Sequence, residues 1–90
     1  MQGVYSGRHV QYVLGNGPRI GAVRPAEIVN VLNGRSGIVN LVVFMDGVDD
    51  GRDYELGIAR FREVPYSKEM RPGTWHMDDR AVTRVVEGIE

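Results

Sequence analysis

The sequence predicts a mainly β protein: a small SH3-like barrel of about five strands with a short C-terminal helix or extension. Short β-prone runs are separated by turn residues, no βαβ alternation is visible, and helix-like spacing is confined to the C-terminus. Ninety residues make one domain, because a chain of this length has room for a single hydrophobic core. We expect that domain to span residues 1–90, with its core at about 8–77 and a tail at 78–90.

Glycine and proline mark the ends of the first two strands. Val10–Leu14 is a short run of β-prone residues, and residues 15–18, Gly-Asn-Gly-Pro, predict a turn directly after it. Pro25 excludes a helix in the next segment. A second strand is therefore expected over Glu27–Leu32, with neither side of it cleanly polar.

A hairpin is predicted in the middle of the chain. Residues 33–37, Asn-Gly-Arg-Ser-Gly, are suited to a tight connection, and Ile38–Met45 is the longest run of β-branched and aromatic residues. We therefore expect Ile38–Met45 to pair with Glu27–Leu32. A polar loop is expected to follow over Asp46–Asp53.

The rest of the chain predicts two more strands and a tail. Glu55–Val64 has a patchy apolar pattern that favours a strand, Pro65–Gly73 is typical of a loop, and Thr74–Met77 predicts a brief aromatic strand. Asp78 or Asp79 is suited to cap a short helix, which we favour over a strand although valine and threonine are poor helix formers. The apolar residues spaced for one face of that helix are Val82, Val85, Val86 and Ile89.

Composition and charge exclude several classes of protein. Hydrophobic residues make up 42% and charged residues 26% of the chain, which is the balance of a folded domain rather than of a disordered one. The formal net charge of −1 provides no global attraction to nucleic acid or membrane, so a site for a polyanion would have to be local. The absence of cysteine excludes disulfides and thiolate metal ligands.

The sequence predicts neither a membrane span nor a secretion signal. No stretch approaches the roughly eighteen apolar residues that a membrane span requires. Met1–Ser6 lacks a basic region followed by an apolar run. We therefore expect a cytoplasmic protein.

No motif predicts a metal site or catalysis. Five acidic residues fall within Asp46–Glu55, a composition similar to that of a calcium loop, but their spacing does not fit one, and a solvated hairpin loop is the better interpretation. His9 and His76 are the two imidazoles, and no hydroxyl lies in a nucleophile-elbow or Ser-x-x-Lys pattern. We expect no metal, no cofactor and no enzymatic activity.

Aromatic and arginine side chains are the first candidate ligand contacts. In an extended segment Trp75 and His76 point to opposite faces, so one can pack inside while the other meets solvent. Trp75 either closes one end of the barrel or stacks, together with Tyr12, Tyr54 or Tyr66, on a ring of a ligand. Arg24 and Arg71 are suited to hold a phosphate, because a guanidinium binds phosphate through two hydrogen bonds.

Two of these candidates have alternative structural interpretations. Arg24, in the rigid turn at Pro25, is equally suited to pair with an acidic neighbour such as Glu27 or Asp46. Asn40, an amide among aliphatic residues, either ties down a loop or faces a ligand. The function requires the Arg-Pro turn and the Trp-His strand to lie together. The predicted site consists of Arg24, Asn40, Trp75, His76, Tyr12 and Arg71.

Four short motifs, in the same order along residues 10–77, carry a family resemblance. They are Tyr12-Val13-Leu14, Arg24-Pro25-Ala26, Val39-Asn40-Leu41 with Val43-Phe44 and Asp46-Gly47, and Gly73-Thr74-Trp75-His76. In these motifs the chain resembles a set of small phage and prophage proteins of similar length. Members of that set often have Trp at the positions of Leu32 and Met77, so an aromatic surface built there is reduced in this chain. The resemblance implies a phage origin and no enzymatic activity.

Two functions follow as expectations. The first is a phage accessory protein that binds a small polar or nucleotide-like ligand without turning it over, for example to sequester a host immune signal in the host cytoplasm. A homo-oligomer with pockets between subunits is expected, because a small barrel has little internal room. The alternative is a virion structural or protein-docking module. Nucleic-acid binding is disfavoured by the charge, and no membrane partner is expected.

Overall fold

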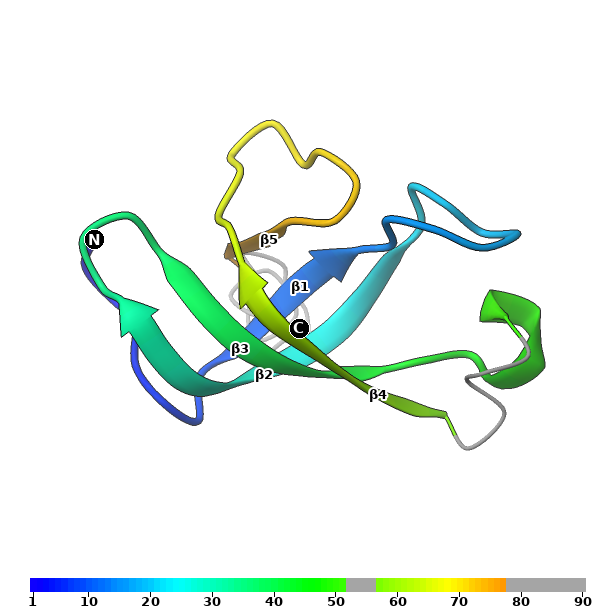
Figure 1. Ribbon diagram of the computed structural model, residues 1–90, viewed down its shortest axis with the longest axis horizontal. Coiled ribbons are helices and arrows are strands. Elements are labelled where there is room, and N and C mark those ends of the chain that lie inside the picture. The colour runs from blue at the N-terminus through cyan, green and yellow to red at the C-terminus, as the bar shows by residue number, and fades with distance from the viewer. Residues whose placement is uncertain (52–56, 78–90) are drawn as a thin grey trace, which may run out of the picture.

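The computed structural model describes residues 1–51 and 57–77. These residues form one antiparallel sheet with the strand order β4-β3-β2-β1-β5 (Figure 1). The strands are β1 (His9–Val13), β2 (Val23–Asn33), β3 (Ile38–Phe44), β4 (Ile58–Val64) and β5 (Trp75–Met77). A single turn of 3-10 helix, η1 (Gly47–Asp50), follows β3. The described part of the chain contains no α-helix.

The five strands are those that the sequence predicts, with shifted ends. The largest difference is β2, which begins at Val23 and contains Pro25 instead of starting after it. The β2–β3 ladder begins only at the pair Ala26–Val43, so Pro25 lies just beyond it. The N–H of Ile28 donates to the carbonyl of Arg8, directly before β1. By alternation the nitrogen of Pro25 faces the β3 side, where no ladder bond is needed. The strand therefore tolerates its proline.

The sheet does not close into a barrel. β4 and β5 are its two edges, and the chain just after β4 joins β5 by one parallel bridge between Tyr66 and Trp75. Figure 1 shows a strongly bent sheet, with the loop between β4 and β5 arching above it. The predicted five-stranded β architecture is thus confirmed, whereas the predicted SH3-like barrel is not, because the sheet is open. The predicted C-terminal helix and the tail at 78–90 lie outside the described residues.

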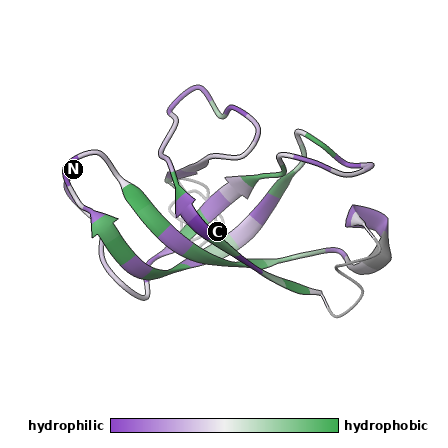
Figure 2. Cartoon of the chain, in the orientation of Figure 1, coloured by the Kyte–Doolittle hydropathy of each residue, from purple (hydrophilic) through white to green (hydrophobic). Residues whose placement is uncertain are grey.

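The hydrophobic core lies on one face of this bent sheet, which we call the inner face. Figure 2 shows hydrophobic residues along much of β2 and β3. Trp75 has no exposed surface, and its indole Nε1 donates to the carbonyl of Gly37 at 2.7 Å. The ring of Tyr66 meets Trp75 edge-on with centroids 5.0 Å apart. The remaining buried apolar residues of the core are Val10, Tyr12, Leu14, Ala26, Ile28, Val39, Leu41, Val43, Met45 and Val64.

Three register shifts interrupt the regular pairing beside β3 in the described residues. The β2–β3 register shifts between Ile28 and Asn30 and again between Val31 and Asn33, and the β3–β4 register shifts between Val39 and Leu41. We call the first and the last of these the two bulges. At the first bulge, the hydroxyl of Ser6 donates to the carbonyl of Val29. The bulges lie at neighbouring positions along the hairpin, so they distort the same patch of the sheet.

Candidate functional site

The outer face of the sheet, opposite the core, carries the candidate site. Side chains alternate between the two faces along a strand, so Leu41 and Val43 of β3 point inward while Asn40 and Val42 point outward. On β4 the same alternation turns Arg60 outward and Phe61 inward, where Phe61 stacks on Tyr12 with ring centroids 4.7 Å apart.

A groove of about 400 Å³ lies at the bulges. Its position follows from the register shifts, because an extra residue on one strand separates the neighbouring side chains. A volume of this size falls within the range of small-molecule sites, about 300–1,000 Å³. The groove is lined by Val29, Asn40, Leu41, Arg60, Phe61 and Arg62.

Hydrogen-bond donors dominate the polar lining of the groove. The side-chain Oδ1 of Asn40 accepts the backbone N–H of Glu63 at 3.0 Å, which fixes the amide plane. Within the described part of the chain, Asn40 Nδ2 has no hydrogen-bond acceptor. Glu63 has a φ of 53°, a left-handed conformation that the bond to Asn40 helps to hold in the bulge.

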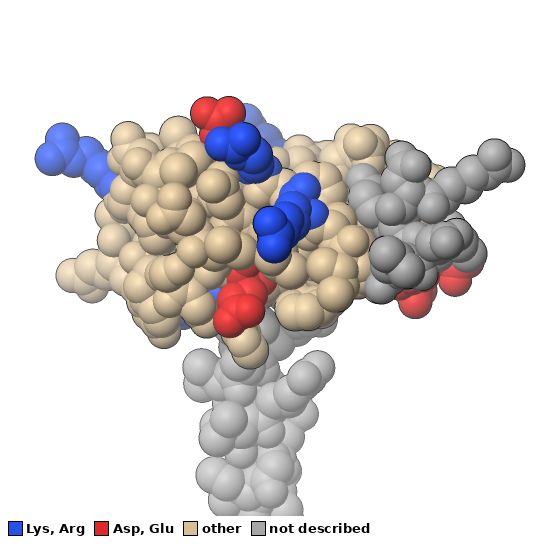
Figure 3. Space-filling model, turned by 60° about the horizontal axis from the view of Figure 1, so that its bottom comes forward, with Lys and Arg blue, Asp and Glu red and all other residues tan. Residues whose placement is uncertain are grey.

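Two arginines supply the positive charge of the groove. Arg60 and Arg62 are both exposed, and among residues 1–51 and 57–77 neither forms an ion pair. Figure 3, which turns the lower side of Figure 1 toward the viewer, shows basic side chains near the middle of this face. The groove therefore combines two guanidinium groups and one amide N–H₂ with the exposed apolar side chain of Val29, while Leu41 and Phe61, which also line it, have inward-pointing side chains. This set of groups suits an anion that carries a flat or apolar part.

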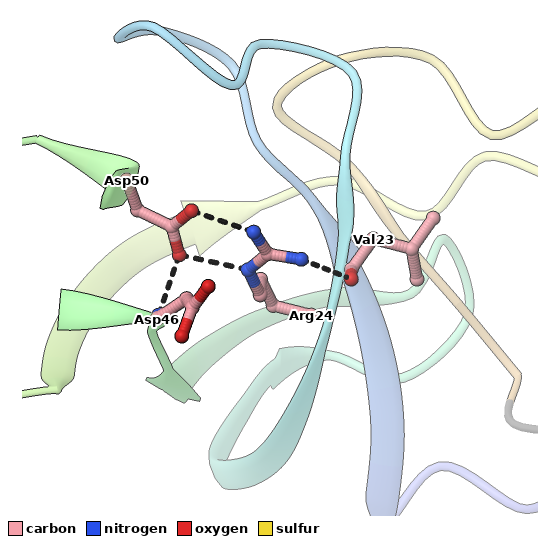
Figure 4. A network of polar contacts seen from close by, with 4 residues as sticks. All are labelled: Val23, Arg24, Asp46 and Asp50. Atoms are coloured by element: carbon pink, nitrogen blue, oxygen red, sulfur yellow. Dashed lines mark hydrogen bonds and ion pairs between the residues drawn. The ribbon is translucent and has the colours of Figure 1, made fainter.

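Arg24, a predicted site residue, points to the inner face and is fully engaged there. Its Nε donates to Asp50 Oδ2 at 2.7 Å, its Nη2 to Asp50 Oδ1 at 2.6 Å and its Nη1 to the carbonyl of Val23 at 3.1 Å. Figure 4 shows the guanidinium facing the carboxylate of Asp50, which also accepts the N–H of Asp46 at 2.6 Å. The expected pairing of Arg24 with an acidic residue is confirmed, but the partner is Asp50 and not Glu27 or Asp46, because the η1 turn brings Asp50 over β2.

The ion pair shifts the pKa values of both Asp50 and Arg24. The hydrogen bonds from Arg24 hold the pKa of Asp50 below its ordinary value although burial acts in the opposite direction. The same bond raises the pKa of Arg24. Asp50 has no exposed surface, so the prediction that all of Asp46–Asp53 forms a solvated loop was wrong for this residue. Residues 52–56 lie outside the described residues.

The Arg-Pro and Trp-His segments do lie together, on opposite sides of β1. Tyr12 pairs with Arg24 on one side and with Trp75 on the other. Both aromatic rings, however, belong to the core: Trp75 is completely buried and Tyr12 is 4% exposed. The structure thus brings these segments into one sheet and gives both rings core positions.

The other predicted site residues lie at separate places. His76 is buried on the outer face, with Nε2 2.9 Å from Oε1 of Gln11. Arg71 is exposed in the loop between β4 and β5. Asn40 alone among the six predicted residues lines the groove.

Sequence reasoning missed Arg60 and Arg62. A signal was present, because residues two apart on a strand project from the same face, and Arg60 and Arg62 are two apart in a predicted strand. What the sequence did not contain was the pair of bulges, which places Val29 and Asn40 beside these arginines.

Neither a metal site nor a membrane span is visible in the described residues. No cluster of three or more potential metal ligands occurs within residues 1–51 and 57–77. The same residues contain no helix of the length and hydropathy needed to cross a bilayer. Comparison of the chain with models of known families, with curated proteins and with solved structures finds no match.

Proposed function

We propose that this protein is a non-enzymatic binding module whose outer-face groove takes a small anionic, nucleotide-like ligand. The observation that carries the proposal is the combination, in one groove, of Asn40 with two arginines that lack acidic partners within the described part of the chain. Because no carboxylate of the described residues pairs with these two arginines, their guanidinium groups can donate hydrogen bonds to an anionic ligand.

The lining assigns a role to each part of such a ligand. A guanidinium donates two parallel hydrogen bonds to a phosphate, so Arg60 and Arg62 hold the phosphate groups. Asn40 Nδ2 donates to a carbonyl or ring nitrogen of a base, while its Oδ1 is already used by Glu63. The exposed side chain of Val29 supplies apolar surface for the base or sugar.

The groove offers donors and apolar surface, which are groups that hold a ligand. Binding without turnover is therefore the activity that we propose. The resemblance to small phage proteins supports sequestration of a host signal as its purpose, and a cytoplasmic location fits that role. A virion or docking role is the alternative.

A thermal-shift screen with nucleotides and other phosphate-bearing signals tests the proposal. A ligand present at about 100 times its Kd stabilises the folded state by about 2.7 kcal/mol, a shift of several degrees in a domain of this size. Arg62→Ala is expected to weaken binding about 10- to 100-fold, because hydrogen bonds to charged groups contribute about 1.5–3 kcal/mol.

Arg71→Ala is the matched variant, because it removes the same charge from an exposed loop residue outside the groove. It is expected to leave the affinity unchanged. Loss of binding in Arg71→Ala with full binding in Arg62→Ala would move the site to the β4–β5 loop and contradict the proposal. A screen in which no phosphate-bearing compound shifts the melting temperature would contradict it as well.

A further inference from the structure

Beside the groove, the outer face of the sheet exposes a row of apolar side chains. Phe44 of β3 is 44% exposed and Ile58 of β4 is 57% exposed, and the two residues are paired across the strands. Pro25 of β2 is also exposed and lies one position beyond the Ala26–Val43 pair, so it continues the row. Contiguous apolar residues on a sheet face are typical of an interaction surface.

The next row along the strands carries opposite charges at its two ends. Val42 of β3 pairs with Glu27 of β2 on one side and with Arg60 of β4 on the other. Val42 is half-buried at the centre of the row. Glu27 and Arg60 are two strands apart, a separation of roughly 10 Å.

We propose that this face packs against the same face of a second copy of the chain, around a two-fold axis that runs along β3. Rotation about such an axis places β2 of one copy opposite β4 of the other. It keeps each row's position along the strands, so the charged row faces the charged row and the apolar row faces the apolar row. Glu27 of each copy then faces Arg60 of the other, so the charged row forms two ion pairs. In the apolar row, Phe44 meets Phe44 and Pro25 meets Ile58.

Charge selects both the partner and the axis. A two-fold interface is self-complementary by construction, and a row with Glu at one end and Arg at the other meets that requirement. An axis across the strands would instead place Glu27 opposite Glu27 and Arg60 opposite Arg60, and like charges in contact are unfavourable. The charge pattern therefore favours a second copy with β3 over β3.

The proposed dimer also changes the surroundings of the ligand groove, an inference that rests on the proposed function. Asn40 and Arg62 lie one row beyond Val42 and Arg60, so pairing brings the two grooves together across the axis. Arg60 has five N–H donors, which allows one edge of its guanidinium to meet Glu27 of the second copy while another faces the groove. The ligand would then be held between subunits.

Sedimentation equilibrium of charge-swap variants, without ligand, tests the dimer. Glu27 also has a neighbour in its own chain, because His9 Nε2 lies 3.8 Å from Glu27 Oε1. The unmodified protein is expected to dimerise at micromolar concentration. Glu27→Arg and Arg60→Glu are each expected to weaken the dimer at least tenfold, because each creates two like-charge contacts. An equimolar mixture of the two variants is expected to recover the dimer, since their charges are complementary.

A second variant keeps the inference falsifiable. Phe44→Asp places a charge at the centre of the apolar row and is expected to give a folded monomer, with folding checked by circular dichroism. A monomeric unmodified protein overturns the inference, as does a dimer that persists in Phe44→Asp or a mixture that stays monomeric. A dimer that forms as expected but binds no phosphate-bearing compound supports the interface and contradicts only the proposed ligand.

Discussion

Arg24 and Asp50, which are 26 positions apart in sequence, form a two-point ion pair that ties β2 to the turn after β3. The N–H of Asp46, two residues after the end of β3, donates to the same carboxylate at 2.6 Å, so one buried side chain holds both this segment and β2. The pair lies on the face opposite the proposed groove. We infer that the pair helps to fix the bend of the sheet.

Asp50→Asn is expected to destabilise the fold by about 3 kcal/mol at neutral pH. Removing one partner of a buried pair costs about 3–5 kcal/mol, and the lower end applies because the Arg24 side chain is 21% exposed. Urea unfolding measures the loss. Asp49→Asn, an exposed carboxyl in the same turn, is the matched control and is expected to change the free energy of unfolding by less than about 0.5 kcal/mol.

The difference in stability between the unmodified protein and Asp50→Asn is expected to depend on pH. The pKa of Asp50 is below its ordinary value of 3.8 in the folded state. A carboxyl with a lowered pKa stabilises the fold above the unfolded-state value, and this stabilisation is lost as the pH falls through the folded-state value. The difference should therefore be constant above about pH 5 and shrink below about pH 4. A difference that stays constant down to pH 2 would contradict the assigned role of Arg24.

Trp75→Phe is expected to lower the free energy of unfolding by about 2–3 kcal/mol and to leave ligand affinity unchanged. The substitution removes the hydrogen bond from Nε1 to the buried carbonyl of Gly37 and leaves a small cavity beside Tyr66. Unfolding and binding are measured on the same preparation. A large loss of affinity without loss of stability would restore Trp75 as a ligand contact.

Gly37→Ala is expected to destabilise the fold by about 2 kcal/mol or more. Gly37 has a φ of +80°, and a Cβ there would lie 2.5 Å from the sulfur of Met1 and 2.9 Å from Cβ of Tyr66. The left-handed conformation alone costs an L-residue about 1–2 kcal/mol. Gly34→Ala in the same turn is the control, because its Cβ would meet only a side chain of Val31 at 3.7 Å. Equal melting temperatures for the two variants would contradict this account of the turn.

Asn40→Asp is expected to abolish anion binding with little change in stability. The aspartate keeps the oxygen that accepts the N–H of Glu63, and it replaces the Nδ2 donor by a negatively charged oxygen next to the ligand. Calorimetric titration measures the affinity and thermal unfolding measures the fold. Unchanged affinity would place the ligand elsewhere, whereas loss of the fold would show that the Nδ2 group has a structural role.

The order of the five strands along the chain followed from the sequence, because apolar runs and turn residues alternate clearly. Glycine and asparagine in residues 33–37 predicted the hairpin, in which Asn33 Oδ1 accepts the N–H groups of Arg35 and Ser36. Pro25 was misleading. Its effect on a strand depends on whether a neighbour needs its N–H, and that depends on where the β2–β3 ladder begins.

The candidate site was harder to predict than the strands. A tryptophan and an arginine in short motifs suit a core and an ion pair as well as they suit a ligand, and Trp75 and Arg24 took the structural roles. The groove arises from two register shifts, which depend on how strands far apart in sequence pair. The sequence singles out Asn40 because an amide among aliphatic residues needs a hydrogen-bond partner. In the structure its side chain accepts the N–H of Glu63, and it lines the groove.

Nuclear magnetic resonance titration of isotope-labelled protein with the best phosphate-bearing compound from the screen shows whether the outer-face groove is the binding site. We expect saturable shifts of the Asn40 side-chain amide and of the Arg60 and Arg62 guanidinium signals, with the indole signal of Trp75 unmoved. Shifts centred on Trp75 or Arg71, with the Asn40 amide unaffected at saturation, would contradict the outer-face groove as the binding site.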